Sequence, residues 1–109
     1  MDEKSFQDQV VELAHTYGYA VAHFRAAQNS SGRYRTPVAY DAKGFPDLVM
    51  VRSDYNDKNR PHRLIFAELK SNVGRLSKEQ ATWIDDLATV AEAYVWRPRD
   101  WDDILAILR

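Results

Sequence analysis

The chain has 109 residues, a formal net charge of −1 and no cysteine, and these three properties exclude several classes of protein. The length predicts one domain with a modest core. The absence of cysteine excludes disulfide bonds, thiolate zinc sites and a cysteine nucleophile, and it fits a cytoplasmic protein. The chain contains no run of 18 apolar residues, so no membrane span is predicted. The polar, acidic residues 1–4 do not resemble a signal peptide.

The charge is distributed unevenly along the chain. Residues 25–78 contain 11 Lys or Arg and 5 Asp or Glu, a local charge of +6, whereas the rest contains 4 and 11, a local charge of −7. A basic segment is typical of proteins that bind the phosphates of nucleic acids, although polar loops also collect arginines. We expect this basic excess to surround the functional site.

The spacing of apolar residues predicts an α/β fold in the order α-β-β-β-α-β-α, which is a small mixed sheet flanked by helices. The expected ranges are 3–17 for the first helix, 19–24, 48–51 and 63–69 for three strands, 78–90 for the second helix, 93–96 for the last strand and 100–108 for the last helix. Polar loops are expected over 26–44 and 53–62, and the second of these joins two strands into a hairpin.

Local signals mark the ends of two of these helices. Asp2 or Ser5 suits the N-cap of the first helix, and Gly18 suits its C-terminal end. Asp100 suits the N-cap of the last helix, ahead of a stripe of apolar residues.

Two short motifs carry the residues best suited to catalysis. Asp47 stands at the start of one predicted strand, and Glu68 and Lys70 stand at the end of the next. Alternate residues of a strand share a face, so Glu68 and Lys70 lie on one face and Leu69 on the other. If the two strands pair, two carboxylates and an ammonium group meet. Two carboxylates suit magnesium, and a lysine beside them orients water or stabilises the charge of a phosphoryl transition state.

Each of these residues also has a simpler interpretation. Asp47 fits an ordinary turn, and Glu68 with Lys70 fits an ion pair on an exposed strand. Gln80 forms a capping box with Ser77, and it equally lies on the side of the second predicted helix that faces the sheet. The joint pattern favours a site, because a carboxylate at the end of a buried strand is costly unless something binds it.

Other candidate residues give weaker signals. Tyr34 between Arg33 and Arg35 suits contact with nucleic acid, and it suits a disordered loop equally well. His23 is more simply a core histidine than a metal ligand. The three tryptophans, Trp83, Trp96 and Trp101, lie at core spacing and favour packing over base stacking.

The ordered set of motifs resembles the VRR-NUC (virus-type replication-repair nuclease) branch of the PD-(D/E)XK nuclease superfamily. The resemblance covers nearly the whole chain, whose size is similar to that of the stand-alone phage and bacterial members. The matching segments are Glu3-x-x-Phe6-Gln7, His23-Phe24-Arg25, Gly44-Phe45-Pro46-Asp47-Leu48-Val49, Phe66-Ala67-Glu68-Leu69-Lys70, Gly74-Arg75-Leu76-Ser77-x-x-Gln80 and Val95-Trp96-Arg97-Pro98-x-x-Trp101.

The resemblance implies a restriction-endonuclease-like core with a site that uses Mg²⁺ or Mn²⁺. It implies that Lys70 positions the attacking water or stabilises the phosphate, and that Gln80 orients water or a phosphate near the metal. The implied catalytic residues are Asp47, Glu68, Lys70 and Gln80, and the implied metal ligands are Asp47, Glu68, Leu69 through its backbone carbonyl, and Glu3.

The resemblance further implies a DNA endonuclease similar to Holliday-junction resolvases, which act as homodimers on branched DNA. A nicking, flap or linear-duplex endonuclease would use the same residues, and a non-catalytic nucleic-acid-binding module on the same fold is a further alternative. The final helix and residues 96–101 offer apolar surface for a dimer. A phage-encoded member would work in the host cytoplasm. The expected DNA contacts are Arg25, Arg33, Tyr34, Arg35, Lys43, Arg75 and Lys78.

Overall fold

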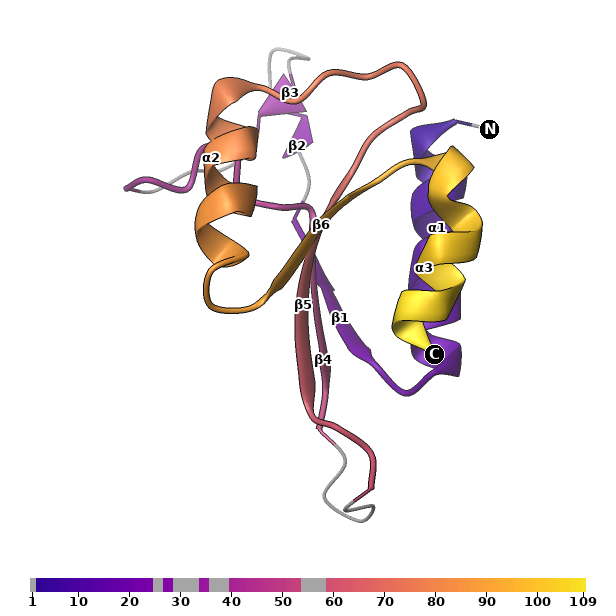
Figure 1. Ribbon diagram of the computed structural model, residues 1–109. Coiled ribbons are helices and arrows are strands. Elements are labelled where there is room, and N and C mark those ends of the chain that lie inside the picture. Colours follow the sequence, from indigo (N-terminus) through magenta and orange to yellow (C-terminus); the bar gives the residue numbers. More distant parts are fainter. Residues whose placement is uncertain (1, 25–26, 29–33, 36–39, 54–58) are drawn as a thin grey trace.

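The computed structural model describes residues 2–24, 27–28, 34–35, 40–53 and 59–109. Within these residues, helices cover both faces of a four-stranded sheet, so the fold has three layers (Figure 1). The predicted α/β class, with a small mixed sheet flanked by helices, is confirmed. The elements are α1 (Glu3–Thr16), β1 (Ala20–His23), β2 (Ala27–Gln28), β3 (Tyr34–Arg35), β4 (Leu48–Arg52), β5 (Arg63–Leu69), α2 (Lys78–Leu87), β6 (Glu92–Trp96), the short 3₁₀ helix η1 (Pro98–Asp100) and α3 (Trp101–Leu108).

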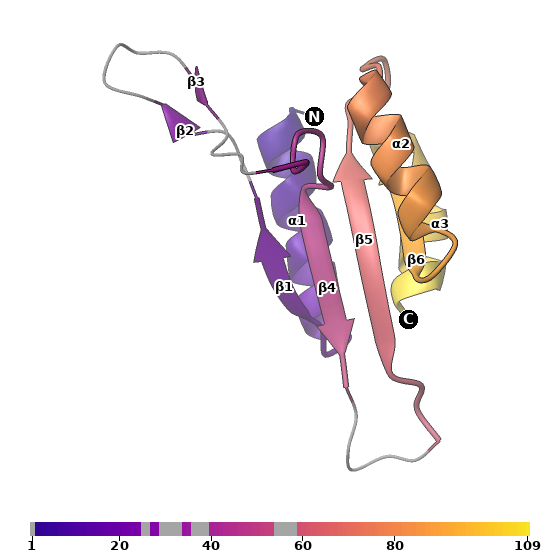
Figure 2. The same ribbon diagram turned by 90° about the vertical axis from the view of Figure 1, so that its left-hand side faces the viewer.

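The order of the strands decides which residues meet at the end of the sheet. The order is β1-β4-β5-β6, with β4 antiparallel to both β1 and β5, and β6 parallel to β5. The C-terminal ends of β1, β5 and β6 and the start of β4 therefore lie at one end of the sheet (Figure 2). The predicted hairpin is the pair β4 and β5.

One face of the sheet carries the core. Alternate residues of β4 and β5 point toward α1 and α3, which lie side by side on this face (Figure 1). The two helices contribute apolar residues at helical spacing, so a continuous core forms. Its fully buried members include Phe6, Val10, Ala14, Leu48, Met50, Ile65, Ala67, Ile104 and Leu108.

The other face is covered only in part. Helix α2 contacts β5 and β6, and none of its ten residues, all within the described part of the chain, is fully buried. Two paired residues on this face of β4 and β5, Val51 and Leu64, remain 42% and 43% exposed. Helix α2 therefore packs on the sheet through partly buried side chains only.

Both predicted ends of the first helix are confirmed. The Asp2 side chain accepts a hydrogen bond of 2.7 Å from the Ser5 backbone N–H. Gly18 has a φ of 88° and donates to the carbonyl of His15, while the next residue donates to Ala14. These two hydrogen bonds close the last turn. Glycine is favoured at position 18 because other residue types would be strained in its left-handed backbone conformation.

Other predicted boundaries are wrong, for local reasons. Helix α2 ends at Leu87 and not at residue 90, because the backbone and hydroxyl of Thr89 both bond the Asp86 carbonyl and turn the chain. Asp100 does occupy the predicted N-cap position of α3, but its carboxylate makes no capping hydrogen bond to that helix and accepts instead from the Arg97 backbone N–H at 2.9 Å. The short strands β2 and β3 pair within the segment expected to be a polar loop. No helix of the described residues is long and apolar enough to cross a membrane.

Candidate active site

Two carboxylates meet at the end of the sheet where β4 starts and β5 finishes. The register that pairs Leu48 with Ala67 brings Asp47 opposite Glu68. The Asp47 Oδ2 atom accepts a hydrogen bond of 3.0 Å from the backbone N–H of Leu69, which fixes Asp47 against the end of β5. The structure thus brings together the two acids that the sequence motifs singled out, while their catalytic roles remain predictions.

Glu68 is a buried acid with one oxygen left unpaired. Its side chain is only 2% exposed. One oxygen, Oε1, accepts from the Gln80 amide, whereas Oε2 is buried and has no hydrogen-bond partner among the described residues. Burial, reinforced by the charge of Asp47, raises the pKa of Glu68 to about 8, and the charge of Lys70 acts in the opposite sense. A buried carboxylate in this position favours a positively charged partner.

Gln80 combines the two roles that the sequence left open. Its Oε1 atom accepts from the Ser77 backbone N–H at 2.9 Å. The backbone N–H of Gln80 donates to the Ser77 hydroxyl at 3.1 Å, which completes the capping box of α2. Its Nε2 atom donates to Glu68 Oε1 at 3.0 Å. One side chain therefore both starts the helix and holds a site carboxylate.

Lys70 and Leu69 point in different directions, as the alternation of the strand predicts. Leu69 is buried in the core below α1 and α3. The backbone N–H of Lys70 donates to the Trp96 carbonyl at 3.0 Å, so pairing with β6 extends one residue beyond β5. The Lys70 side chain is half-buried, and its charge acts on Glu68. A cation thus stands beside the two carboxylates.

Glu3, the third acid that the resemblance implied as a metal ligand, comes from helix α1. It is exposed in the first turn of α1, and its charge is the smallest of the influences that raise the pKa of Glu68. Across the described ranges, no three Asp, Glu, His or Cys residues gather so that they could hold a metal ion. Asp47 and Glu68 are the two carboxylates that meet here, and metal roles for them and for Glu3 stay predictions.

The predicted DNA contacts are described only in part. Arg75 and Lys78 are exposed beside the start of α2, and the exposed Lys43 forms an ion pair of 3.6 Å with Glu79. Arg25 and Arg33 lie outside the described residues, and so do the side chains of Tyr34 and Arg35.

The expectation that the basic excess surrounds the site is wrong for three arginines. Arg52, Arg60 and Arg63 lie at the opposite end of the sheet, where β4 ends and β5 begins. There they bond backbone carbonyls at the C-terminal ends of α1 and α3, which carry partial negative charge. Arg52 donates to Tyr17 and Leu108, Arg60 to Tyr17, and Arg63 to Ile107.

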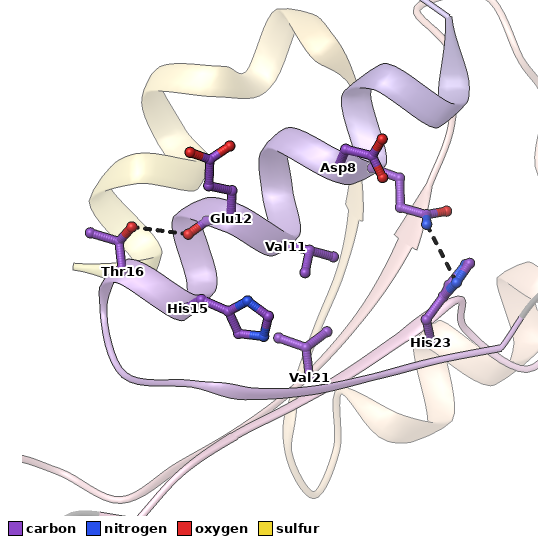
Figure 3. A pocket seen from close by; sticks show the side chains of 8 residues that line it. Asp8, Val11, Glu12, His15, Thr16, Val21 and His23 are labelled. Carbon is purple, nitrogen blue, oxygen red and sulfur yellow. Dashed lines mark hydrogen bonds between the residues drawn. The ribbon is translucent and has the colours of Figure 1, made fainter.

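A groove of about 630 Å³ lies between α1 and the edge strand β1 (Figure 3). His15, Val21 and His23 line it together with residues of α1. His23 is half-buried, and its Nδ1 atom is 3.4 Å from the Gln7 amide nitrogen. The groove contains none of the predicted catalytic residues, and His23 fits the simpler interpretation of a packed, hydrogen-bonded histidine.

The sequence did not reveal that the two residues before Asp47 hold its turn in place by apolar packing. The ring of Phe45 makes edge contacts with Phe24, Phe66 and Trp83 at centroid distances of 5.8, 5.9 and 5.1 Å, and Pro46 is fully buried. A Phe-Pro pair directly before an acid was the available signal. Its two apolar residues anchor the turn that presents the carboxylate.

The fold and the site define a compact domain of the restriction-endonuclease-like type, with two carboxylates and a lysine at one end of a mixed sheet. Residues 9–97 match the family model of the VRR-NUC domain, which spans well over half of the chain, so the protein belongs to the VRR-NUC domain family. The resemblance is thereby confirmed, and the domain is of nuclease type. Glu3 precedes the matched residues. No curated protein and no solved structure matches the chain.

Proposed function

We propose that the protein is a metal-dependent, structure-specific DNA endonuclease that hydrolyses phosphodiester bonds, with branched DNA of the Holliday-junction kind as its substrate. The observation that carries the proposal is the buried Oε2 atom of Glu68, which has no hydrogen-bond partner among the described residues, in a carboxyl group that also feels the charges of Asp47 and Lys70. Membership of a nuclease-type family supports the same reaction class.

The residues present fit a hard divalent cation. Magnesium is commonly held by one or two carboxylates and completes its shell with water and substrate phosphate. Asp47 and Glu68 supply the two carboxylates, and we propose the Leu69 carbonyl and Glu3 as further donors. When bound, Mg²⁺ or Mn²⁺ supplies positive charge that polarises the phosphate and lowers the pKa of a water molecule.

The chain's own side chains divide the remaining work. Gln80 fixes the orientation of Glu68 through its amide hydrogen bond. The Lys70 ammonium stabilises the negative charge that grows on the phosphate in the transition state. The exposed Lys43, Arg75 and Lys78 hold neighbouring phosphates of the DNA by charge.

A homodimer is part of the proposal because a four-way junction has two-fold symmetry, which two equivalent sites would match. The surface that the sequence suggested for dimerisation is largely used inside the chain, since Trp96, Ile104 and Leu108 are buried. Exposed apolar surface lies instead on the α2 side of the sheet, at Val51 and Leu64.

The test is a cleavage assay on a matched panel of four-way junction, flap, nicked duplex, linear duplex and single strand. It compares the intact protein with Asp47→Ala, Lys70→Ala and the exposed control Asp102→Ala, in Mg²⁺, Mn²⁺ or EDTA. Paired, metal-dependent cuts in the junction, lost in the first two variants only, are expected. Cutting of other substrates would support a nicking, flap or duplex endonuclease, and junction binding without any cutting would support a binding module.

A further inference from the structure

The turn before β4 holds α2 at several points. The Trp83 Nε1–H group donates to the Asp41 carbonyl at 3.1 Å, and the rings of Phe45 and Trp83 are in edge contact. The ion pair between Lys43 and Glu79 adds a further link. These contacts hold residues 41–45 against the first two turns of α2.

The closest approach in this region is made by Gly44. Its φ is 83°, a left-handed backbone that glycine adopts without strain. A Cβ atom at this position would lie 2.7 Å from both the backbone carbon and the Cβ of Glu79, and 2.8 Å from the backbone nitrogen of Gln80. Two of these three atoms are backbone, so a change of side-chain rotamer cannot relieve the collision. Any larger residue must push the turn and the first turn of α2 apart.

We propose that Gly44 is a positioning residue of the site: it lets the turn approach α2 so closely that the Gln80 amide reaches Glu68. This inference rests on the proposed nuclease function. Gln80, whose backbone nitrogen is one of the three atoms that an added Cβ would meet, is also the residue whose side-chain amide lies 3.0 Å from Glu68 Oε1. A displacement of the helix start by a few tenths of an ångström or more therefore acts directly on that hydrogen bond.

The proposal gives the segment Gly44-Phe45-Pro46-Asp47 one joint task. Asp47 supplies one carboxylate, and Phe45 and Pro46 anchor the turn by apolar packing. Gly44 allows the close approach of α2, whose Gln80 orients the other carboxylate. Loss of a hydrogen-bond partner behind a metal ligand commonly weakens metal binding by roughly 10- to 100-fold. We expect Gly44→Ala to weaken Mn²⁺ binding by about tenfold, at the low end of that range.

Gly18 provides a matched control at the opposite end of the sheet. Its φ is 88°, so alanine there meets the same unfavourable backbone conformation as alanine at position 44. A Cβ atom on Gly18 would meet nothing closer than the Arg52 Cδ atom at 3.7 Å, an ordinary contact distance. Gly18→Ala therefore reproduces the backbone strain without moving α2.

The experiment follows the side-chain amide signals of Gln80 by ¹H–¹⁵N NMR in metal-free protein, and assigns them by their absence in Gln80→Ala. The same samples are titrated with Mn²⁺ by calorimetry. We expect Gly44→Ala to shift the Gln80 signals toward those of an exposed glutamine and to weaken Mn²⁺ binding about tenfold. Gly18→Ala is expected to change neither quantity.

Unchanged Gln80 signals in a folded Gly44→Ala, or equal changes in Gly18→Ala, would overturn the proposal. If Gly44→Ala fails to fold, Trp83→Phe replaces it, because this change removes the hydrogen bond to Asp41 and keeps an aromatic ring at that position. A shift of the Gln80 signals in the same direction is then expected, and unchanged signals would again overturn the proposal. The NMR readout requires no DNA cleavage, so it remains decisive even if the protein cuts no substrate.

Discussion

Glu68→Gln is expected to remove a pH-dependent loss of stability from the metal-free protein. The pKa of Glu68 rises from an ordinary value of 4.5 to about 8 on folding, because its carboxylate is buried beside Asp47. The folded protein therefore holds this proton more tightly than the unfolded chain does. The stability contributed by Glu68 is complete below pH 4.5, falls as the pH rises through the window from 4.5 to 8, and changes no further above it.

The size of the effect follows from the same pKa. One pKa unit corresponds to about 1.4 kcal/mol, so deprotonation between pH 6 and pH 9 lowers the free energy of unfolding by roughly 2 to 3 kcal/mol. This is a large share of the roughly 5 to 15 kcal/mol that stabilises a typical domain. Glutamine has nearly the same shape and can still accept from Gln80, but it carries no titrating proton.

The assay is urea unfolding in EDTA at pH 6 and pH 9, for the intact protein, Glu68→Gln and Glu12→Gln. Glu12 is an exposed helical glutamate and serves as the control. We expect the intact protein and the control to lose roughly 2 to 3 kcal/mol more than Glu68→Gln over this range. Equal losses in all three proteins would refute the reasoning that burial beside Asp47 raises the pKa of Glu68.

Three further predictions concern the site and the opposite end of the sheet. Gln80→Leu removes the amide that holds Glu68, while the backbone N–H of residue 80 can still donate to the Ser77 hydroxyl of the helix cap, so Mn²⁺ affinity measured by calorimetry should fall by about tenfold or more. Arg63→Ala breaks a partly buried pair with Glu92 and should lower the free energy of urea unfolding by about 2 kcal/mol or more without changing Mn²⁺ affinity. Mn²⁺ at about 100 times its Kd should stabilise the intact protein by about 2.7 kcal/mol and leave Asp47→Asn almost unaffected, as thermal unfolding would show. A similar Mn²⁺ effect on both proteins, or altered metal affinity in Arg63→Ala, would contradict this assignment of roles.

The sequence predicted the parts of the site that depend on local pattern. Alternation along two strands and the turn-forming residues between them indicated a hairpin, and a hairpin with this register necessarily brings Asp47 opposite Glu68. The capping motif likewise predicted where α2 begins, and its glutamine faces the sheet because the first turn of the helix lies over the end of β5.

The parts that the sequence could not predict depend on contacts between distant segments. The arginines of β4 and β5 looked like a basic patch, but Arg52 and Arg63 bond helix carbonyls that only the folded chain brings near. Asp100 bonds a backbone group three residues earlier because the chain makes a 3₁₀ turn there first. Gly44 matters through Glu79, which is 35 positions away in sequence and in contact distance only after folding.

The most direct test of the account is an anomalous difference map from crystals of the protein grown with Mn²⁺. A strong peak is expected within coordinating distance, about 2.0 to 2.6 Å, of carboxylate oxygens of both Asp47 and Glu68. A saturated crystal with no peak between these two residues, or with Mn²⁺ bound only elsewhere, would contradict the assignment of this carboxylate pair as the catalytic centre.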